Sequence, residues 1–346
     1  MNVLMIGAGR AVQGGVSTVV NQYYAAGLDQ QINLKYIGTM EDGSKIKKAF
    51  IAAYSYIQFC SDVKSYDIVH VHMSSRASFY RKSLFIKKAY KAGKKIIIHM
   101  HGSEFDVFYD KECDDKQKQQ VREVFAMSNA VIALSEEWKE YLSKICDESK
   151  IIILYNAVKM PNFQRKDYSD KAVLFLGRLG KRKGTYDLIE AIPKVLEIDK
   201  EICFYLGGDG DVEEFKRLCT EKGIQDNVTF LGWVTGDTKV DYLKKCSTFI
   251  LPSYHEGMPM AILEAMSFGD VVISTYVGGI PKVIQNDRNG YLVKAGEVDE
   301  IVKAVLTAVN GNRKVEVGRQ AYNTILQSFN IDKNVKNLIQ LYHSII

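Results

Sequence analysis

Several features are missing from this sequence of 346 residues, and each absence removes a class of protein. No apolar run approaches the length that crosses a bilayer, so we expect no membrane-spanning helix. The opening MNVLMIG lacks a basic n-region and reads as a strand, so we expect no signal peptide. The six cysteines include no C-x-x-C pair, which argues against a disulfide framework or a cysteine zinc site. We therefore expect a cytoplasmic protein with reduced cysteines.

What the sequence does have is an alternation of strand-like and helical stretches along almost its whole length. Helical spacing is clear from Lys45 to Val63, for example. This alternation predicts an α/β fold with parallel sheets covered by helices on both faces. The pattern restarts near Lys171, after the polar segment 161–170. We therefore predict two doubly wound, Rossmann-like domains, residues 1–165 and 166–330. The strand-like runs are NVLMIG, INLKYIG, DIVHVHM, KIIIHM, AVIAL, IIILY, AVLFLG, ICFYLGG, VTFLG, TFILP, DVVIS and GYLV.

Positive charge is concentrated in the first half. Residues 1–165 contain 23 Lys and Arg against 17 Asp and Glu, whereas residues 166–346 contain 23 against 24. Residues 76–95 hold eight of these cations and no acid. Such a basic face with apolar residues fits an anionic membrane surface, and a solvated helix is the alternative. Without a nucleic-acid module, nucleic acid is a poorer explanation. Helical periodicity places Phe79, Phe85, Ile86 and Ala89 inward, and Tyr80, Arg81, Leu84, Lys87, Lys88 and Lys91 outward.

The most informative stretch is EGMPMAILEAMSFGDVVIS, residues 256–274. It places Glu256 in a loop and Glu264 more than a turn inside the helix that follows, with Pro259 at the first helical position. A helix N-terminus attracts anions, and carboxylates accept hydrogen bonds from hydroxyls. The combination suits a sugar joined to a nucleotide through a diphosphate. The backbone N–H groups expected to face the anion belong to Gly257, Met258 and Met260.

This stretch resembles the E-x7-E motif of the retaining glycosyltransferases of family 4, which have the two-domain GT-B fold. The resemblance covers nearly the whole chain and is strongest in its second half. It implies two Rossmann-like domains facing a central cleft, with the nucleotide sugar bound by the second. It also implies that the last helix, residues 331–346, crosses back to the first domain. No metal and no cofactor are expected.

Three further segments of the second half resemble this family. GRLGKRKG places Arg178 and Lys183 where the family neutralises the leaving nucleoside diphosphate. GGDGD follows the next strand. Its two aspartates also suggest a D-x-D metal site, but the family has a turn beside the nucleotide here, which would involve Gly208. In FLGWV, the family's backbone contact to the base corresponds to Val234.

In the first half, GAGRAVQGGVSTVV lacks the glycine spacing of a dinucleotide site. Gly14 and Gly15 instead resemble the family's glycine loop near the donor phosphate and the acceptor. His101, in HMHGSEFD, resembles the family histidine that lines the sugar and acceptor site. Strand alternation puts His70 and His72 on one face, and likewise His99 and His101. A zinc site would need these rings to converge and a matching carboxylate. Because sequence neighbours on strands need not converge, we interpret the other three histidines as structural.

The predicted function is a retaining, metal-independent glycosyltransferase with catalytic residues Glu256, Arg178, Lys183 and His101. We expect it to move a hexose or N-acetylhexosamine from a UDP-sugar, or alternatively a GDP-sugar, to a sugar or polyprenyl- or lipid-linked acceptor. By resemblance the pathway makes a surface polysaccharide or glycolipid, which places the protein in the cytoplasm or on the inner face of the membrane. The rivals are a GT-B nucleotide-sugar epimerase, distinguished by its products without acceptor, and a non-catalytic sugar-nucleotide-binding partner subunit.

Overall fold

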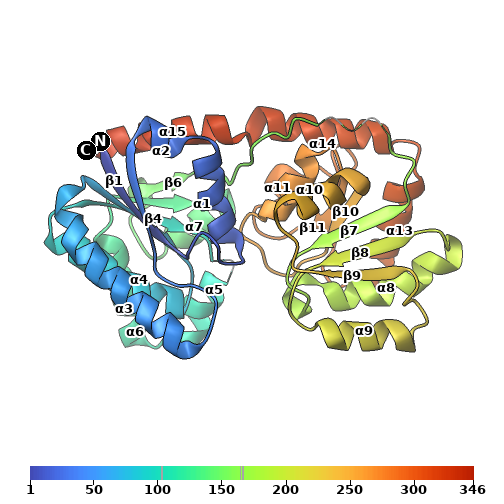
Figure 1. Cartoon of the computed structure of the whole chain (residues 1–346), viewed down its shortest axis with the longest axis horizontal. Coiled ribbons are helices and arrows are strands. Elements are labelled where there is room, and N and C mark those ends of the chain that lie inside the picture. Colours follow the sequence, from blue (N-terminus) through green and yellow to red (C-terminus); the bar gives the residue numbers. More distant parts are fainter. Residues whose placement is uncertain (103, 164, 166) are drawn as a thin grey trace. The chain divides into compact units, whose positions relative to one another are not determined.

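The computed structural model describes residues 1–102, 104–163, 165 and 167–346. The chain divides into two compact units (Figure 1). Unit 1 contains Met1–Lys159 and the terminal segment Ile331–Ile346, and unit 2 contains Met160–Asn330. The division therefore falls shortly before the boundary that we expected after residue 165. In the described part of the chain, no helix is both long enough and apolar enough to cross a membrane.

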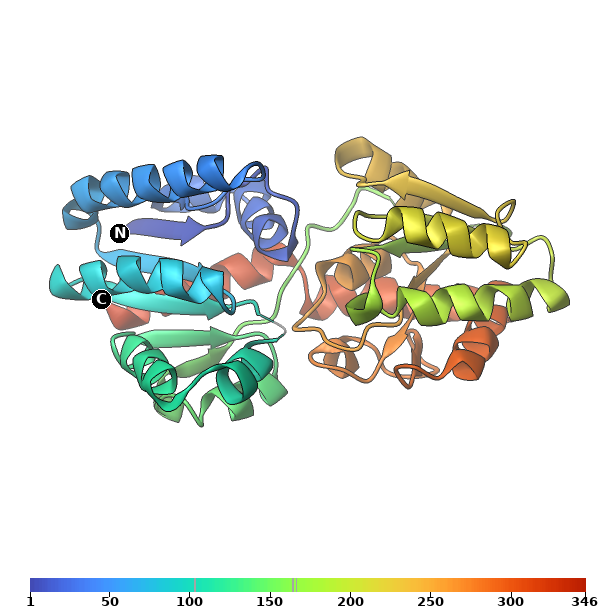
Figure 2. The ribbon, with the colours of Figure 1, turned by 90° about the horizontal axis from the view of Figure 1, so that it is seen from below.

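Unit 1 is built on a sheet of six parallel strands in the order β2-β1-β3-β4-β5-β6. The strands are β1 (Asn2–Gly7), β2 (Asn33–Gly38), β3 (Ile68–Met73), β4 (Lys95–Met100), β5 (Ala130–Ala133) and β6 (Ile151–Ile153). The helices are α1 (Gly15–Ala25), α2 (Leu28–Gln31), α3 (Lys45–Asp62), α4 (Ala77–Lys91), α5 (Phe105–Val107), α6 (Asp115–Ala126), α7 (Glu136–Leu142) and α15 (Ile331–Ile345). In Figure 2, α3, α4 and α6 lie side by side over one face of this sheet.

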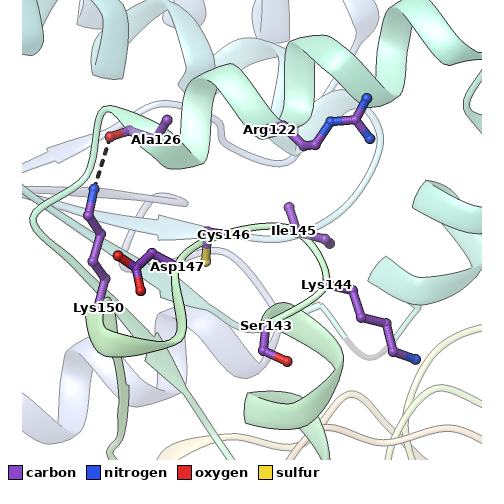
Figure 3. Close-up of a pocket in the computed structure, with 8 residues that line it drawn as sticks. All are labelled: Arg122, Ala126, Ser143, Lys144, Ile145, Cys146, Asp147 and Lys150. Atoms are coloured by element: carbon purple, nitrogen blue, oxygen red, sulfur yellow. Dashed lines mark hydrogen bonds between the residues drawn. The ribbon is translucent and has the colours of Figure 1, made fainter.

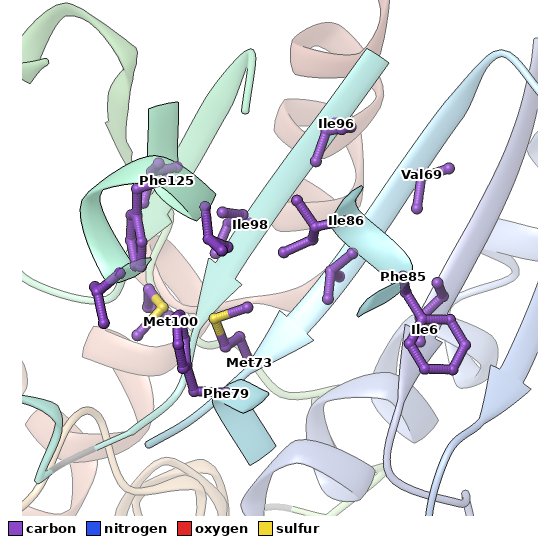
Figure 4. Packing of buried hydrophobic residues seen from close by; sticks show 14 of the residues in the cluster. Ile6, Val69, Met73, Phe79, Phe85, Ile86, Ile96, Ile98, Met100 and Phe125 are labelled. Carbon is purple, nitrogen blue, oxygen red and sulfur yellow. The ribbon is translucent and has the colours of Figure 1, made fainter. Parts of the chain in front are cut away.

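The main core of unit 1 lies between the sheet and these three helices (Figure 4). Alternate residues of each strand point into it, because successive side chains of a strand face opposite ways. Ile98 and Met100 of β4 therefore meet the apolar stripe of α4. The prediction for that stripe is confirmed, since its four residues are buried: Phe79, Phe85, Ile86 and Ala89.

The other face of the sheet carries imidazoles. His70 and His72 of β3 alternate with the core residues of that strand, and His72 pairs in register with His99 of β4. This face is closed in part by α15, whose Tyr342 hydroxyl lies 2.6 Å from Nδ1 of His70. Asn334 of α15 also donates to the carbonyl of Tyr155 at 2.6 Å. The terminal helix thus forms part of the interior of unit 1.

Unit 2 has a second sheet of six parallel strands, in the order β12-β11-β10-β7-β8-β9. In Figure 1, α10, α11 and α14 cover one face of this sheet, and α8, α9 and α13 cover the other. The strands are β7 (Ala172–Leu176), β8 (Cys203–Gly207), β9 (Val228–Gly232), β10 (Thr248–Leu251), β11 (Val271–Thr275) and β12 (Tyr291–Val293). The helices are α8 (Thr185–Ile198), α9 (Val212–Glu221), α10 (Gly236–Lys245), α11 (Met260–Ser267), α12 (Ile280–Val283), α13 (Val298–Asn310) and α14 (Lys314–Ser328).

The polar segment 161–170, the candidate linker between the two predicted domains, is anchored on unit 2 through its described residues Arg165 and Tyr168. The Arg165 side chain is only 4% exposed, and its Nη2 lies 2.8 Å from the Asp270 carboxylate. The Tyr168 hydroxyl donates to the carbonyl of Gly269 at 2.8 Å. Burial raises the pKa of Asp270, and Arg165 opposes this shift. A paired arginine therefore fixes the segment that leads into β7, which explains why unit 2 begins before it.

Candidate active site

The strand order of unit 2 identifies where a ligand should bind. The sheet changes direction around β7, which lies between β8 and β10, and ligands of such sheets bind beyond the carboxyl ends of the strands at this point. Two loops meet there, residues 177–184 after β7 and residues 252–259 after β10. They approach so closely that a Cβ on Gly184, at φ 67°, would lie 1.9 Å from the carbonyl oxygen of Pro252. Only glycine fits this contact.

Glu256 and Lys183 meet across these two loops. Lys183 Nζ lies 2.5 Å from Glu256 Oε1, and their side chains are 14% and 7% exposed. Ser253 donates to the same oxygen at 2.8 Å. Among the described residues nothing is bonded to Oε2 of Glu256. A carboxylate held on one oxygen and open on the other is suited to accept a hydroxyl from a ligand.

Glu264 is arranged in the same way. It lies within α11, its side chain is 11% exposed, and its Oε1 is 2.7 Å from Nζ of Lys239 on α10. No described residue is bonded to its Oε2. The predicted position of Pro259 was wrong by one residue, because Pro259 has an extended ψ of 120° and caps the helix, which begins at Met260. Met260 is buried, and so are Gly257 and Met258 in the preceding turn.

Three residues of this site were not predicted from the sequence motifs. Ser253 and Lys239 hold the two glutamates, but both lie outside the motif. Gly278, at φ 56°, follows β11, and a Cβ there would lie 2.0 Å from the carbonyl oxygen of Glu256. The Gly-Gly pair of the flanking YVGGI run was the available signal. Its backbone packs directly against the loop that carries the catalytic candidate.

The remaining candidates of unit 2 lie at the same edge of the sheet. Arg178 is exposed, and no described residue forms a hydrogen bond or ion pair with its guanidinium. Gly208 donates to the carbonyl of Gly232 at 2.7 Å, between the ends of β8 and β9. Val234 packs against Gly207. Asp211 accepts a hydrogen bond from the hydroxyl of Tyr186 of α8 at 3.1 Å, which ties the GGDGD turn to that helix.

In unit 1 the candidates lie at the carboxyl ends of β1 and β4. Gly14 precedes α1 and Gly15 begins it, and a Cβ on either would meet nothing within 4 Å. His101 follows β4 directly, and its backbone N–H donates to the carbonyl of Met73 at 2.8 Å. Its Nε2 lies 2.8 Å from Nδ1 of His72.

The four histidines of β3, β4 and the residue after β4 do converge. Ring nitrogens of His70, His72 and His99 lie within 4.8 Å of one another, a spacing that a metal ion can bridge. Their rings are stacked, however, with the centroids of His70 and His72 4.6 Å apart and 13° between planes. A metal needs lone pairs that point at one centre. His70 also uses its nitrogens on Tyr342 and His99, at 2.6 and 3.2 Å. We interpret the group as a hydrogen-bonded stack.

Burial keeps these imidazoles neutral. It lowers the pKa of His70 to about 3, because a charged ring loses its hydration inside the sheet–helix layer. The pKa of His72 and that of His99 are lowered well below the ordinary value by burial and by neighbouring imidazoles. For His101, which is partly exposed at the strand end, burial and then the charge of Lys82 lower the pKa. A neutral His101 can donate or accept a hydrogen bond.

A separate pocket of about 400 Å³ lies elsewhere in unit 1 (Figure 3). Lys150 donates to the carbonyl of Ala126 at one side of it, at 3.1 Å. This pocket adjoins the amino end of β6, the edge of the sheet opposite to the usual ligand edge. Burial raises the pKa of its Cys146 thiol to about 11, so the thiol is not activated. None of the candidate residues lines it. Its lining residues are Arg122, Ala126, Ser143, Lys144, Ile145, Cys146, Asp147 and Lys150.

Comparisons with known proteins agree with this geometry. The family model described as Glycosyl transferases group 1 matches residues 159–325, and the one described as Glycosyltransferase Family 4 matches residues 36–160. A UDP-Gal:alpha-D-GlcNAc-diphosphoundecaprenol alpha-1,3-galactosyltransferase of Escherichia coli is 27% identical over 340 residues, 91% of this chain and 84% of that protein. An uncharacterized glycosyltransferase of Methanocaldococcus jannaschii is 30% identical over 232 residues, 61% of this chain and 59% of that protein.

The solved structures give the same fold. Anabaena Alr3699/HepE in complex with UDP aligns with a TM-score of 0.80 at 16% identity, over 99% of this chain and 100% of that chain. A sucrose-phosphate synthase from Thermosynechococcus elongatus aligns with the same TM-score at 17% identity, over 99% of this chain and 98% of that chain. These matches show the fold, and the two family models, which together match residues 36–325, show the kind of enzyme. The chain belongs to the family 4 glycosyltransferases and has their two-domain GT-B fold.

Proposed function

We propose that this glycosyltransferase is retaining and metal-independent, and that it moves a hexose or N-acetylhexosamine from a nucleoside diphosphate sugar. The observation that carries the proposal is the pair of Lys183 and Glu256 at the carboxyl edge of the unit 2 sheet. A cation for a diphosphate and a carboxylate for a sugar stand side by side there. On this proposal unit 2 binds the donor and unit 1 binds the acceptor.

The chain's residues divide the work of the transfer. Lys183 and Arg178 stabilise the negative charge that develops on the leaving diphosphate, and a preorganised electrostatic contact of this kind is usually the largest catalytic contribution. Glu256 accepts hydrogen bonds from hexose hydroxyls through its open oxygen, and Glu264 accepts them from the ribose. The bond from the anomeric carbon to the diphosphate breaks while the bond to the acceptor oxygen forms. The acceptor proton passes to the leaving phosphate on the same face.

A uridine nucleotide is the preferred donor base, with guanosine as the alternative. The support comes from relatives, since the Escherichia coli protein is a UDP-Gal transferase and the Anabaena structure holds UDP. The acceptor is proposed to be lipid-linked, because the name of the Escherichia coli relative includes a diphosphoundecaprenol. Such an acceptor belongs to surface polysaccharide or glycolipid synthesis.

Nucleotide binding tests the donor site. With EDTA present, UDP at about 100 times its Kd should raise the free energy of unfolding by roughly 2.7 kcal/mol, a shift of several degrees. Glu264→Ala should weaken UDP binding roughly tenfold, because a hydrogen bond to a charged group is lost. The same change should raise the donor KM. Glu213→Ala, at an exposed glutamate of α9, is the matched control and should retain the full shift.

The outcomes of this melting experiment are distinct. A shift with GDP alone would replace the base but keep the site. No shift with UDP, GDP or ADP would contradict the nucleotide-binding function itself. A shift that Glu264→Ala leaves unchanged would remove Glu264 from the ribose.

The membrane surface proposed for residues 76–95 extends to α3. The apolar spacing of α3 predicted a helix correctly. Four large apolar side chains of this helix are nevertheless exposed and do not join the core. α3 and α4 lie side by side, with the rings of Phe59 and Phe85 5.1 Å apart. Leu84 of α4 is also 54% exposed. The outward residues of α3 are Ile46, Phe50, Tyr54 and Ile57, which are 83%, 70%, 61% and 69% exposed.

Charge supports an anionic lipid surface as the partner of these two helices. No acid occurs from Ser44 to Cys60 or from Ser74 to Ser103. Exposed Lys45 and Lys48 lie in the first turn of α3, and Lys91 lies in the last turn of α4. Lysines flanking an exposed apolar stripe are typical of helices that lie in the membrane interface.

Liposome co-sedimentation tests this surface. The protein should sediment with vesicles containing anionic lipid at low salt. The double change Phe50→Asp and Ile57→Asp should reduce the bound fraction at least tenfold, since two side chains that enter the membrane interface become charged. Val315→Asp, at an apolar side chain of α14 that is 55% exposed, is the matched control and should bind like the wild type. Equal sedimentation of all three proteins would rule out α3 as the docking surface.

A further inference from the structure

Lys82 is a buried ammonium group without a carboxylate partner. The residue is 2% exposed, and the one hydrogen bond of its Nζ among the described residues goes to Ser78 Oγ at 3.3 Å. That oxygen already accepts the backbone N–H of Ser74 at 3.3 Å. The residues outside the described part are Ser103, Gln164 and Lys166, so none of them carries a carboxylate. Burying a charge without a counter-charge is strongly unfavourable. An anion from outside the chain would supply the missing counter-charge.

The position of Lys82 within the fold is that of a ligand site. The unit 1 sheet changes direction around β1, which lies between β2 and β3. Ser74 and Ser78 lie just beyond the carboxyl end of β3, at this point. The neighbouring Arg81 reaches the next strand end, where its Nε lies 3.3 Å from Thr39 Oγ1. Thr39 in turn donates to the carbonyl of Gly7, the last residue of β1.

Two neighbouring cations of this corner, Lys82 and Arg81, are not paired with any described acid. Arg81 forms no ion pair with any residue that the structure describes, and burial lowers its pKa. Burial, and then the charge of Arg81, lower the pKa of Lys82 to about 7. The charge of Lys82 in turn acts on His101 and His72 and lowers the pKa of both imidazoles. Two cations and the predicted acceptor histidine thus lie at one strand edge, and no described acid forms a hydrogen bond or ion pair with either cation.

We propose that Lys82 and Arg81 form an anion subsite that holds a phosphate or diphosphate group of the acceptor. This inference rests on the proposed function, in which the donor diphosphate is held by Lys183 and Arg178 of unit 2. A phosphate matches the corner because it carries up to two charges and accepts several hydrogen bonds. Arg81 supplies a fork, Lys82 a point charge, and the serine hydroxyl of Ser78 a further donor. The acceptor is then a phosphorylated molecule, such as a sugar joined to a lipid through phosphate.

Calorimetric titration with inorganic pyrophosphate tests the subsite in the full-length protein. The titration is made with and without saturating UDP, so that the donor site is filled in one series. Lys82→Met should weaken pyrophosphate binding at least tenfold in the presence of UDP, and should leave the melting temperature equal or higher because an unpaired buried charge is removed. Lys91→Met, the same change at an exposed position of α4, should bind like the wild type. Arg81→Gln, at a partly exposed position, should weaken binding without altering the buried site.

The outcomes separate this inference from the proposed function. If UDP binds but Lys82→Met and Arg81→Gln leave the pyrophosphate affinity unchanged, the subsite is overturned and the donor site stands. If UDP does not bind but pyrophosphate affinity still depends on Lys82, the donor assignment fails and the subsite stands. Malate, a dicarboxylate, is the comparison anion. If malate binds more tightly than pyrophosphate and its affinity depends on Lys82 in the same way, the assignment to phosphate is overturned.

Discussion

Mild acid is expected to destabilise unit 1. His70, His72 and His99 are fully buried, and the pKa of each lies far below that of a free imidazole. Below pH 6.5 the unfolded chain binds protons at these positions. In the folded chain His70 stays neutral down to about pH 3, and the lowered pKa of His72 and of His99 keeps both of these rings neutral in mild acid. The contribution of these histidines to stability is therefore constant at alkaline pH and falls as the pH drops through 6.5.

The expected loss is large. Each such histidine lowers the free energy of unfolding by about 1.4 kcal/mol between pH 7.5 and pH 5.5, so the three together give about 4 kcal/mol. A typical domain has only about 5–15 kcal/mol in total. Denaturant unfolding measured at pH 7.5, 6.5 and 5.5 provides the test.

Two variants show whether the stack is responsible. His99→Leu should remove about a third of the pH dependence, because one of three buried imidazoles is gone. His343→Leu changes an exposed histidine of α15 and should preserve the dependence. A free energy of unfolding that stays constant from pH 7.5 to pH 5.5 would contradict this prediction. It would show that the folded and the unfolded protein bind the same number of protons over this range.

Replacement of Lys183 is expected to reduce turnover by about 100-fold or more. Its ammonium group is fixed by Glu256, so it is already oriented when the donor arrives. The change to alanine removes a cation from the leaving diphosphate and also leaves the nearly buried Glu256 carboxylate without its charged partner. Both effects raise the barrier, and the donor KM should change less than kcat because the contact strengthens in the transition state.

The measurement is the steady-state release of nucleoside diphosphate from a nucleotide sugar. The base of this donor is that of the nucleotide that shifts the melting temperature. Lys181→Ala is the matched control, since Lys181 is an exposed lysine of the same helical turn, Lys181–Lys183. It should retain turnover within a few fold of the wild type. Near-normal turnover of Lys183→Ala would exclude this lysine from the active site.

The sheets were predictable because both are parallel and covered on two faces. Strands of such sheets are continuous apolar runs, and runs such as KIIIHM and DVVIS are difficult to mistake for anything else. Every run that we predicted overlaps a strand of the structure. The motif also placed Glu256 in its loop and Glu264 in its helix, because a glycine–proline turn before an apolar helix is a local signal.

What the sequence could not provide depends on contacts between distant segments. Periodicity identified α3 as a helix, but it does not say which side of a helix is covered, and Ile46 and Phe50 proved to be exposed. Strand alternation placed His70 and His72 on one face, yet their meeting with His99 required the register between β3 and β4. Lys82 was left unassigned, because hydropathy alone gives no reason to bury a lysine.

The contact between Tyr342 and His70 has a consequence for how the protein is made. The ribosome produces β1–β6 first, and α15 only after all of unit 2, whereas unit 2 is one continuous segment. The nascent first sheet must therefore wait with His70 and its neighbours uncovered while the inserted unit folds. Chaperones and ribosome-associated factors have this interval in which to act, and the late arrival of α15 ends it.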